Sequence, residues 1–404
     1  MPIEIRGRIP FEGKTATSST DAGRYAAFFV FPNGAPTADP EVIGRAAREQ
    51  EALGFDSSLV PQNSARPDVW SVVGWALAAT RNLKLVAAHR VGLQQPTLAA
   101  RTFATLDRLS NGRQLVHIIQ GRTDEDMQRD GDFLVKSERY ERSAEYLEIF
   151  RRELTEQEAF SFEGKFYRIR DAWSAVKPVQ HPYGAISLAG TSPAALELAA
   201  KHADVYTVGG TSPDEVATHI QRAQDVARPY GKELRFWYGG FNVILGKTDD
   251  EAWARAEAVA DEVERFKATH EIAPSINAIQ VSTAATGGSA QSAQPDREGP
   301  IYHRLSRISG HGPTIVGSPQ TLVEALLEYY ERGVSIITLG GLCELIAGSG
   351  PDLLTSEDRA LLRATISGLR EGVAERDAGR AAAGVGAATF HPGASVAQAV
   401  GAAA

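Results

Sequence analysis

The sequence predicts an α/β protein whose parallel sheet closes into a (β/α)8 barrel. Between Tyr25 and Leu339, short apolar runs typical of buried strands alternate with longer segments of helical periodicity. This alternation indicates parallel strands joined by crossover helices. Eight repeats can be counted along the chain, and eight is the number that closes a barrel. A doubly wound open sheet is the main alternative, but such a sheet seldom uses eight units.

The expected strands are the apolar runs, and the expected helices lie between them. We place the strands at 26–31, 59–60, 83–88, 115–119, 186–189, 205–208, 241–245 and 336–339. We place the helices at 39–54, 70–80, 96–110, 141–154, 194–202, 213–230, 249–266 and 318–333. Helix ends carry their own signals. Asp39-Pro40 predicts an N-cap with a proline in the first turn, and Asn111-Gly112 predicts a left-handed stop.

Three segments depart from the barrel pattern. Residues 160–169 alternate around Glu163-Gly164 and predict a small β-hairpin. Residues 270–313 are rich in Ser, Ala, Gly and Gln, and we expect a lid or a mobile insertion there, before the last barrel helix. The expected domain organisation is an N-terminal extension at 1–24, a barrel at 25–375 with its inserted segment near 270–313, and an Ala/Gly-rich tail at 376–404.

Composition limits the function classes. The chain of 404 residues has a net charge of −8 and no basic run, which argues against nucleic acid as a partner. Cys343 is its single cysteine and the nine His lack ligand spacing, so we expect no disulfide framework and no metal site. No apolar run approaches the ~18 residues that would span a membrane, and no apolar leader is evident. We therefore expect a cytoplasmic protein.

Active sites of barrels lie at the carboxyl ends of the strands, and this rule selects candidate residues. Polar side chains follow the second, third and fourth strands at Gln62, Arg66, His89, Arg90 and Gln120, and the fourth strand itself carries His117. The fifth and sixth strands end in near-identical turns, Gly190-Thr191-Ser192-Pro193 and Gly210-Thr211-Ser212-Pro213. Amides and hydroxyls at a helix N-terminus suit a bound anion, but ordinary capping by the two serines explains the same pattern.

Three longer motifs resemble the bacterial luciferase-like flavin-dependent monooxygenases, nearest to their alkanesulfonate monooxygenase branch. They are PTLAARTFATLDRLSNGR (96–113), RDGDFLVKSERYERSAEYL (129–147) and TDDEAW (248–253). The resemblance implies a barrel that takes reduced flavin mononucleotide (FMNH2) from a separate NAD(P)H:flavin reductase and uses O2 to oxygenate a small organic substrate. It also implies a homo-oligomer. No GxGxxG follows a strand, so we expect no nicotinamide site in this chain.

The resemblance assigns the flavin phosphate to two positions. Tyr140 and Ser192 match the family's phosphate ligands, and Gly190 and Thr191 adjoin the serine. Lys136 stands four residues before the tyrosine, where the family commonly has a His. A lysine is a cation that still suits a phosphate, although its side chain is more flexible.

Further positions are assigned in the same way. His117 takes the place of the family's strand-four Asn, which lies along the flavin ring, and imidazole can fill that role by hydrogen bonding and stacking. Arg139 and Asp126 match positions that contact flavin in related enzymes. The expected cofactor site is completed by Gln62, Arg90 and Gln120, and the expected catalytic residues are Arg66, His89, Asn242 and His303.

The substrate side departs from the alkanesulfonate pattern. Gly240 and Asn242 replace an Arg and a His on strand seven, Arg66 replaces a Cys, and Leu342 replaces a Tyr. Because Arg holds a sulfonate by charge-assisted hydrogen bonds that glycine cannot supply, we expect some other small substrate, such as a different organosulfur compound. Two other functions stay open. One is coenzyme F420-dependent hydride transfer in the same superfamily, and the other is flavin binding without catalysis.

Overall fold

The computed structural model describes residues 2–30, 37–121, 123–210, 212–270, 295–346 and 352–382. The chain divides into two compact units, and the boundaries fall inside two strands of the sheet. Among the described residues, one unit consists of Leu59–Trp237, and the other combines Pro2–Ser58 with Tyr238–Ala382.

The main sheet is the predicted (β/α)8 barrel. Its eight strands follow one another in hydrogen-bonded order as β1-β2-β3-β4-β7-β8-β9-β13, and β13 pairs with β1, which closes the circle. This closure rules out the open doubly wound sheet. The strands are β1 (Glu4–Arg8), β2 (Ser57–Val60), β3 (Lys84–Arg90), β4 (Gln114–Ile119), β7 (Ile186–Ala189), β8 (Val205–Val208), β9 (Arg235–Leu245) and β13 (Val334–Gly340).

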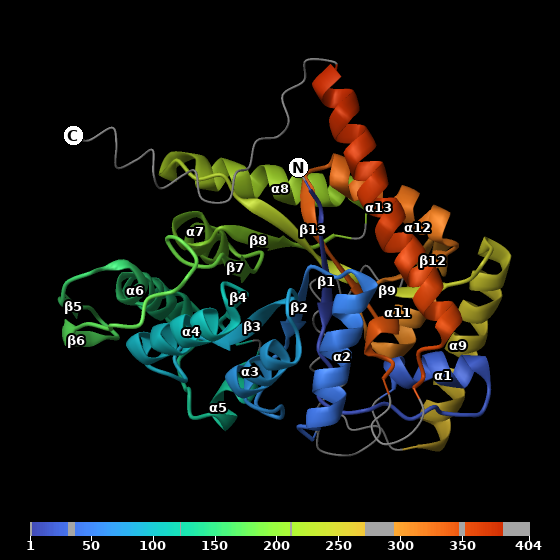
Figure 1. Cartoon of the computed structure of the whole chain (residues 1–404), viewed down its shortest axis with the longest axis horizontal. Coiled ribbons are helices and arrows are strands. Elements are labelled where there is room, and N and C mark those ends of the chain that lie inside the picture. Colours follow the sequence, from blue (N-terminus) through green and yellow to red (C-terminus); the bar gives the residue numbers. More distant parts are fainter. Residues whose placement is uncertain are drawn as a thin grey trace. The chain divides into compact units, whose positions relative to one another are not determined.

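The eight expected helices are present, labelled in Figure 1. They are α2 (Pro40–Leu53), α3 (Val69–Ala79), α4 (Pro96–Ser110), α6 (Lys136–Thr155), α7 (Pro193–His202), α8 (Pro213–Ala227), α9 (Asp249–Thr269) and α12 (Pro319–Glu331). Their predicted ends are confirmed. Asp39 Oδ1 accepts from the backbone N–H groups of Glu41 and Val42. Asn111 ends α4 in the left-handed conformation, with a φ of 57°.

The strand expected at 26–31 is wrong. Residues Asp21–Phe29 form helix α1, whose N-cap Thr20 accepts from Gly23 N, so the apolar run is the buried face of a helix. The first strand is β1, which lies inside the expected N-terminal extension and pairs with β13. Its polar sequence concealed it. Arg6 is only 2% exposed, because it pairs with Glu4 (Nη2–Oε1, 2.6 Å) and donates to Ser57 Oγ (2.9 Å).

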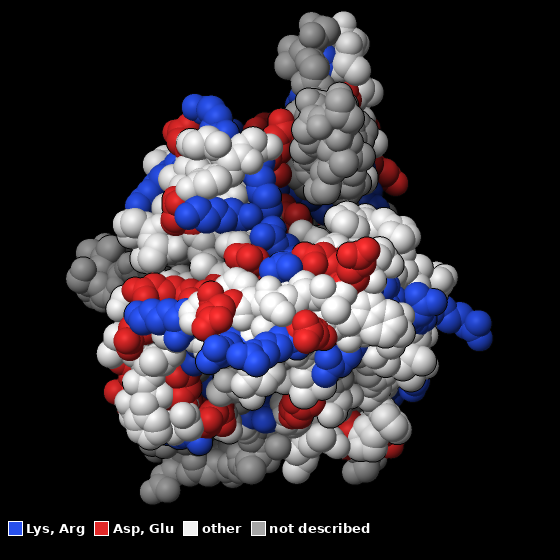
Figure 2. Space-filling model, turned by 90° about the vertical axis from the view of Figure 1, so that its left-hand side faces the viewer, with Lys and Arg blue, Asp and Glu red and all other residues white. Residues whose placement is uncertain are grey.

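The small hairpin is confirmed. Strands β5 (Phe160–Glu163) and β6 (Arg168–Ala172) pair antiparallel. Glu145 on α6 holds the turn, because its carboxylate accepts from the backbone N–H groups of Lys165, Phe166 and Tyr167. On the face that carries this hairpin, Lys and Arg groups alternate with Asp and Glu groups (Figure 2). Among the described residues of this face, acidic and basic groups are thus interspersed.

The expected lid falls largely outside the described residues, which omit 271–294. Its remainder is an ordered addition to the sheet. Strands β10 (Arg297–Glu298), β11 (Ile301–Tyr302) and β12 (Thr314–Gly317) continue from β9 in the order β10-β11-β12-β9, with helix α11 (His303–Ser309) between β11 and β12. Helix α13 (Ser356–Ala382) runs into the expected tail, and residues 383–404 also lie outside the described chain.

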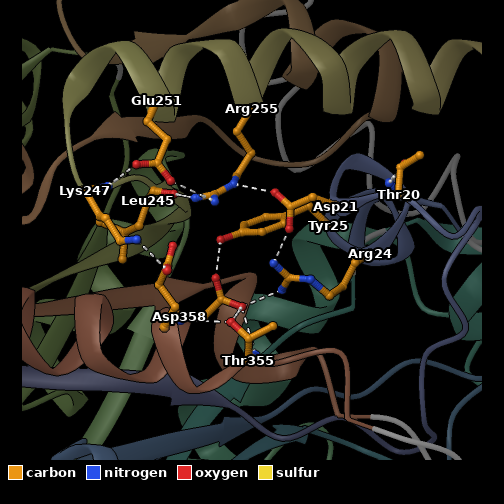
Figure 3. A network of polar contacts seen from close by, with 12 residues as sticks. Thr20, Asp21, Arg24, Tyr25, Leu245, Lys247, Glu251, Arg255, Thr355 and Asp358 are labelled. Atoms are coloured by element: carbon orange, nitrogen blue, oxygen red, sulfur yellow. Dashed lines mark hydrogen bonds and ion pairs between the residues drawn. The ribbon is translucent and has the colours of Figure 1, made fainter.

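A buried polar network joins α1, α9 and α13 (Figure 3). Asp358 on α13 is 1% exposed and accepts from Tyr25 Oη (2.7 Å), from Arg24 Nη1 (2.5 Å) and from Thr355 N and Oγ1. The guanidinium of Arg255, on α9, lies 5.1 Å from the centre of the Tyr25 ring and donates to the carbonyl of Leu245, the last residue of β9. The network therefore fixes three helices to the end of a barrel strand.

Among the described helices, none combines the length and the apolar character that a membrane crossing needs.

We predict that Asp358→Asn lowers the free energy of unfolding by about 3 kcal/mol, because it leaves the partly buried Arg24 guanidinium without its innermost carboxylate. Urea titration followed by circular dichroism measures the change. Asp261→Asn is the matched control, since that carboxylate is 71% exposed, and its loss should cost less than about 1 kcal/mol. Equal effects of the two substitutions would contradict the assigned role of Asp358.

Candidate active site

The turn after β7 brings together three groups at the N-terminus of helix α7. Ser192 caps the helix by accepting from Ala195 N (3.2 Å). A Cβ built on Gly190 would lie 3.0 Å from Tyr140 Oη, so the tyrosine hydroxyl lies against the turn. Tyr206 Oη donates to the carbonyl of Gly190, and burial, with Tyr140 nearby, raises the pKa of Tyr206 to about 12. Two residues expected to bind phosphate, Tyr140 and Ser192, are therefore neighbours.

Gly190 is required at this turn for two reasons. Its φ of +135° is a conformation that residues with a side chain rarely adopt, and a Cβ there would lie 2.6 Å from Ala195 Cβ. Thr191 is exposed beside it. Lys136 is also exposed and lies one turn before Tyr140 on α6, on the same face of that helix.

The second, near-identical turn is chemically different. Ser212 caps α8 by accepting from Glu215 N (3.3 Å), and the carboxylate of Glu215 accepts in return from Ser212 N (3.4 Å). This capping box places a negative charge at the N-terminus of α8, where Asp214 adds another. The corresponding residues of α7 are Ala194 and Ala195, which carry no charge. Only the N-terminus of α7, of the two, is electrostatically open to an anion.

Buried ion pairs surround the end of β3. Arg90 is 2% exposed and pairs with Asp126 and with Asp130 (2.7 Å). Gln62 Oε1 accepts from Arg90 N (3.1 Å), and Asp126 Oδ1 accepts from Ser64 Oγ (2.5 Å). Gln62, Arg90 and Asp126 are thus brought together as expected. They satisfy one another, which fixes the short helix α5 (Asp124–Arg129) to the loops after β2 and β3.

The buried guanidinium of Arg139 is only partly hydrogen-bonded within the described residues. It is 1% exposed, and its Nη1 donates to Asp124 Oδ1 (2.8 Å) and to the carbonyl of Leu134 (2.7 Å). Its Nε and Nη2 have no hydrogen-bond partner within the described residues. Because an unpaired buried donor is costly, these atoms are suited to an anionic or polar ligand. Arg139 and Tyr140 are consecutive residues of α6.

His117 lies in the polar interior of the barrel. Its Nδ1 is 3.0 Å from Ser187 Oγ on β7, and its ring packs edge-on against Trp237 with the centroids 4.9 Å apart. Ser187 Oγ donates its own proton to the carbonyl of Val116, so it accepts from His117 Nδ1–H. This hydrogen bond assigns the Nδ1 tautomer to a neutral His117.

His89 faces the other way, which corrects its expected catalytic role. His117 on β4 pairs in register with Ala88 on β3, so these two side chains lie on the same face of the sheet. His89, the next residue on β3, therefore points to the opposite face. There His89 Nε2 lies 2.6 Å from Tyr146 Oη, and burial lowers the pKa of His89 to about 4. It is a neutral histidine packed between the sheet and α6. Gln120 also contacts α6, donating to Ser143 Oγ (3.2 Å).

The remaining expected catalytic residues are divided between the units. Arg66 is half-buried in the loop after β2. Asn242 belongs to the other unit, where it is 3% exposed and donates from Nδ2 to the carbonyl of Gly312 (2.9 Å). His303 lies at the start of α11, with Nε2 3.2 Å from Glu298 Oε2. No described contact joins His303 to Asn242.

Arg8 and Glu344 were missed by sequence reasoning. Arg8 ends β1 and donates to the carbonyl of Gly239 (3.2 Å), while Glu344 accepts from Gly341 N (3.3 Å). Both lie near Asn242. Polar atoms of Arg8, Glu344 and Asn242 all lie 3.3–3.5 Å from the point where a Cβ on Gly340 would be. Arg8 would have been found if the polar segment 4–8 had been recognised as a strand.

Comparison with known proteins decides the family. The model for the luciferase-like monooxygenase family matches residues 22–335. The chain belongs to the luciferase-like monooxygenase family. This confirms the family that the motifs indicated and, with it, an oxidoreductase of the flavin-dependent monooxygenase superfamily. The nearness to the alkanesulfonate branch stays a prediction.

Several solved structures match the fold of nearly the whole chain. The long-chain alkane monooxygenase LadA has 17% identity and a TM-score of 0.68, covering 98% of this chain and 94% of LadA. The oxygenating constituent of 3,6-diketocamphane monooxygenase from Pseudomonas putida, in complex with FMN, has 17% identity and a TM-score of 0.64, with coverages of 92% and 99%. The coenzyme F420-dependent tetrahydromethanopterin reductase of Methanopyrus kandleri has 17% identity and a TM-score of 0.59, with coverages of 90% and 96%. At such identities the likeness is one of fold.

The lowered pKa of His89 makes stability depend on pH. Between its ordinary value of 6.5 and about 4, the unfolded chain binds a proton that the folded luciferase-like barrel excludes, so the free energy of unfolding falls as the pH falls. We expect a loss of about 3 kcal/mol from pH 7 to pH 4 attributable to this residue. Unfolding titrations across this range should show a shallower slope for His89→Gln and an unchanged slope for a variant at the exposed His181. A slope that is the same in all three proteins would contradict the buried, neutral state of His89.

Proposed function

We propose that this protein is the oxygenase of a two-component system. It takes FMNH2 from a separate NAD(P)H:flavin reductase and uses O2 to oxygenate a small organic substrate. The observation that carries the proposal is the uncharged N-terminus of α7, which has Tyr140 Oη lying against its Gly190 turn. An uncharged helix N-terminus beside a tyrosine hydroxyl suits an anion, and FMN carries a terminal phosphate monoester, which supports the proposal for a protein of the luciferase-like monooxygenase family.

The phosphate ligands follow from the geometry of that turn. The Ser192 hydroxyl and the N–H of Ala194 would donate to the phosphate, as would Tyr140, since Pro193 has no N–H and Ala195 N already donates to Ser192. Arg139 supplies buried donors without partners among the described residues, and Lys136 supplies a positive charge from the first turn of α6. The turn before α8 is excluded from this role, because the carboxylate of Glu215 already lies there.

The residues of the barrel interior orient the ring. When bound, the reduced flavin supplies the electrons with which O2 is activated. The contact with Ser187 holds the imidazole of His117 in one orientation, edge-on to Trp237, where it borders the flavin ring. The pairs of Arg90 with Asp126 and Asp130 hold α5 in place beside the loops after β2 and β3.

We predict that Ser192→Ala and Tyr140→Phe each weaken FMN binding about tenfold, since each removes one hydrogen bond to a charged phosphate. Affinity for riboflavin, which has no phosphate, should stay unchanged. Ser212→Ala is the matched control because it removes the same cap from α8, and it should leave both affinities unchanged. Fluorescence titration with each flavin measures these values. A parallel loss of FMN and riboflavin affinity would contradict the phosphate assignment.

The reaction class has a separate test. Mixed with air-saturated buffer, the protein loaded with FMNH2 should consume O2, and a turned-over substrate should gain one oxygen atom from 18O2. The reduced form of coenzyme F420 should bind more weakly and support no O2 uptake. Hydride transfer from reduced F420 without O2 uptake would instead favour the reductase activity named for the Methanopyrus kandleri protein.

A further inference from the structure

We infer that Tyr206 is a positioning residue of the cofactor site, whose hydroxyl holds the Gly190 peptide so that the N–H of Thr191 becomes a further donor to a phosphate. Tyr206 lies on β8 and acts through the turn after β7 rather than on the ligand. The inference rests on the proposed placement of the flavin phosphate at α7. It adds one donor to that site and one supporting residue that the sequence motifs did not indicate.

The register of β7 with β8 directs the Tyr206 side chain toward this turn. Tyr206 pairs with Leu188, so the two side chains lie on the same face of the sheet. Ser187, the neighbour of Leu188, contacts His117 in the barrel interior, so Leu188 and Tyr206 face the helix layer instead. Gly190 follows Leu188 by two residues, and Tyr206 Oη donates to its carbonyl from the adjacent strand.

The Tyr206 hydroxyl is a dependable donor to that carbonyl. A carbonyl oxygen only accepts, so the phenol supplies the proton of this hydrogen bond. Tyr206 is 3% exposed, and burial raises the pKa of its hydroxyl to about 12, so the proton is present at neutral pH. Because the ring belongs to a strand of the barrel, the Gly190 carbonyl is tied to the sheet.

The Gly190 peptide needs this tie. Glycine has a wide choice of backbone conformations, so its φ of +135° does not by itself fix the peptide that follows it. The bond between Gly190 and Thr191 is trans, since the cis bond of the described chain is His181-Pro182. In a trans peptide the carbonyl and the N–H point in opposite directions. With its carbonyl held toward Tyr206, the peptide turns the N–H of Thr191 to the other side.

The N–H of Thr191 is open to a ligand there. Thr191 is exposed, and no hydrogen bond among the described residues uses its N–H. Tyr140 Oη lies against the same turn, and Arg139, its neighbour on α6, keeps two buried N–H groups without a partner in the described chain. Unpaired donors of this kind, at a turn that leads into a helix N-terminus, suit a phosphate monoester.

Removing the Tyr206 hydroxyl tests the inference by affinity. Tyr206→Phe keeps the buried ring and releases the Gly190 peptide, so we expect FMN affinity to fall about fivefold and riboflavin affinity to stay unchanged. Tyr330→Phe is the matched control. It removes a buried hydroxyl that donates to Asp377 (2.7 Å) in the other unit, and it should change neither affinity. Unchanged FMN affinity in Tyr206→Phe would overturn the inference.

A second measurement separates positioning from a merely structural role. TROSY spectra of protein labelled with 15N-threonine report the N–H of Thr191, and the Thr191→Ser variant assigns its peak. Inorganic phosphate and FMN should shift this peak in the wild-type protein, and riboflavin should not. In Tyr206→Phe the shift caused by phosphate should be lost, while the other threonine peaks keep their positions. A wild-type Thr191 peak that does not respond to phosphate would contradict the assigned donor.

The same samples distinguish this inference from the proposed function. A Thr191 peak that responds to inorganic phosphate, in a protein that binds no FMN, would refute the oxygenase and leave Tyr206 as the positioning residue of an anion site. Wild-type protein that prefers FMN to riboflavin, with the same preference in Tyr206→Phe, would refute the role of Tyr206 alone.

Discussion

The uncharged first turn of helix α7 is the electrostatic feature on which the proposed cofactor site depends. The first N–H groups of a helix have no partner inside the helix and carry a partial positive charge, so an anion is stabilised there unless a side chain already provides one. At α8 the carboxylates of Asp214 and Glu215 provide it. At α7 the same two positions are alanines. The turn keeps Gly190 at a φ of +135°, with Tyr140 Oη close to it, so the tyrosine hydroxyl and the N–H of Ala194 belong to the same short segment.

Much of this fold follows from the sequence, because most strands of the barrel are apolar and most helices have clear end signals. The first strand, β1, could not be predicted in this way. Glu4, Arg6 and Arg8 occupy alternate positions of β1, and a strand whose interior face carries charges has no apolar pattern to detect. The apolar residues 26–29 lie in helix α1, not in the strand expected at 26–31, because a short apolar run does not by itself distinguish a buried helix from a buried strand.

The candidate site shows the same division. Tyr140 and Ser192 could be paired from motifs, since motif positions reflect the family's cofactor. The orientation of His89 could not be predicted from the sequence. Neighbouring residues of a strand point to opposite faces of the sheet, and only the register of β3 with β4 shows that His89 and His117 point to opposite sides. The cluster of polar side chains around Gly340 draws on three segments far apart in the sequence, at Arg8, Asn242 and Glu344. Only the folded chain brings them together.

Placing at the N-terminus of α7 the negative charge that α8 carries is the most direct test of whether the flavin phosphate binds there. Ala194 is exposed and occupies the position of Asp214, so Ala194→Asp should be tolerated by the fold. It should weaken FMN binding about tenfold and leave riboflavin binding unchanged, while the uncharged Ala194→Asn should alter neither affinity. Undiminished FMN affinity in Ala194→Asp, measured by fluorescence titration, would contradict the placement of the flavin phosphate at α7.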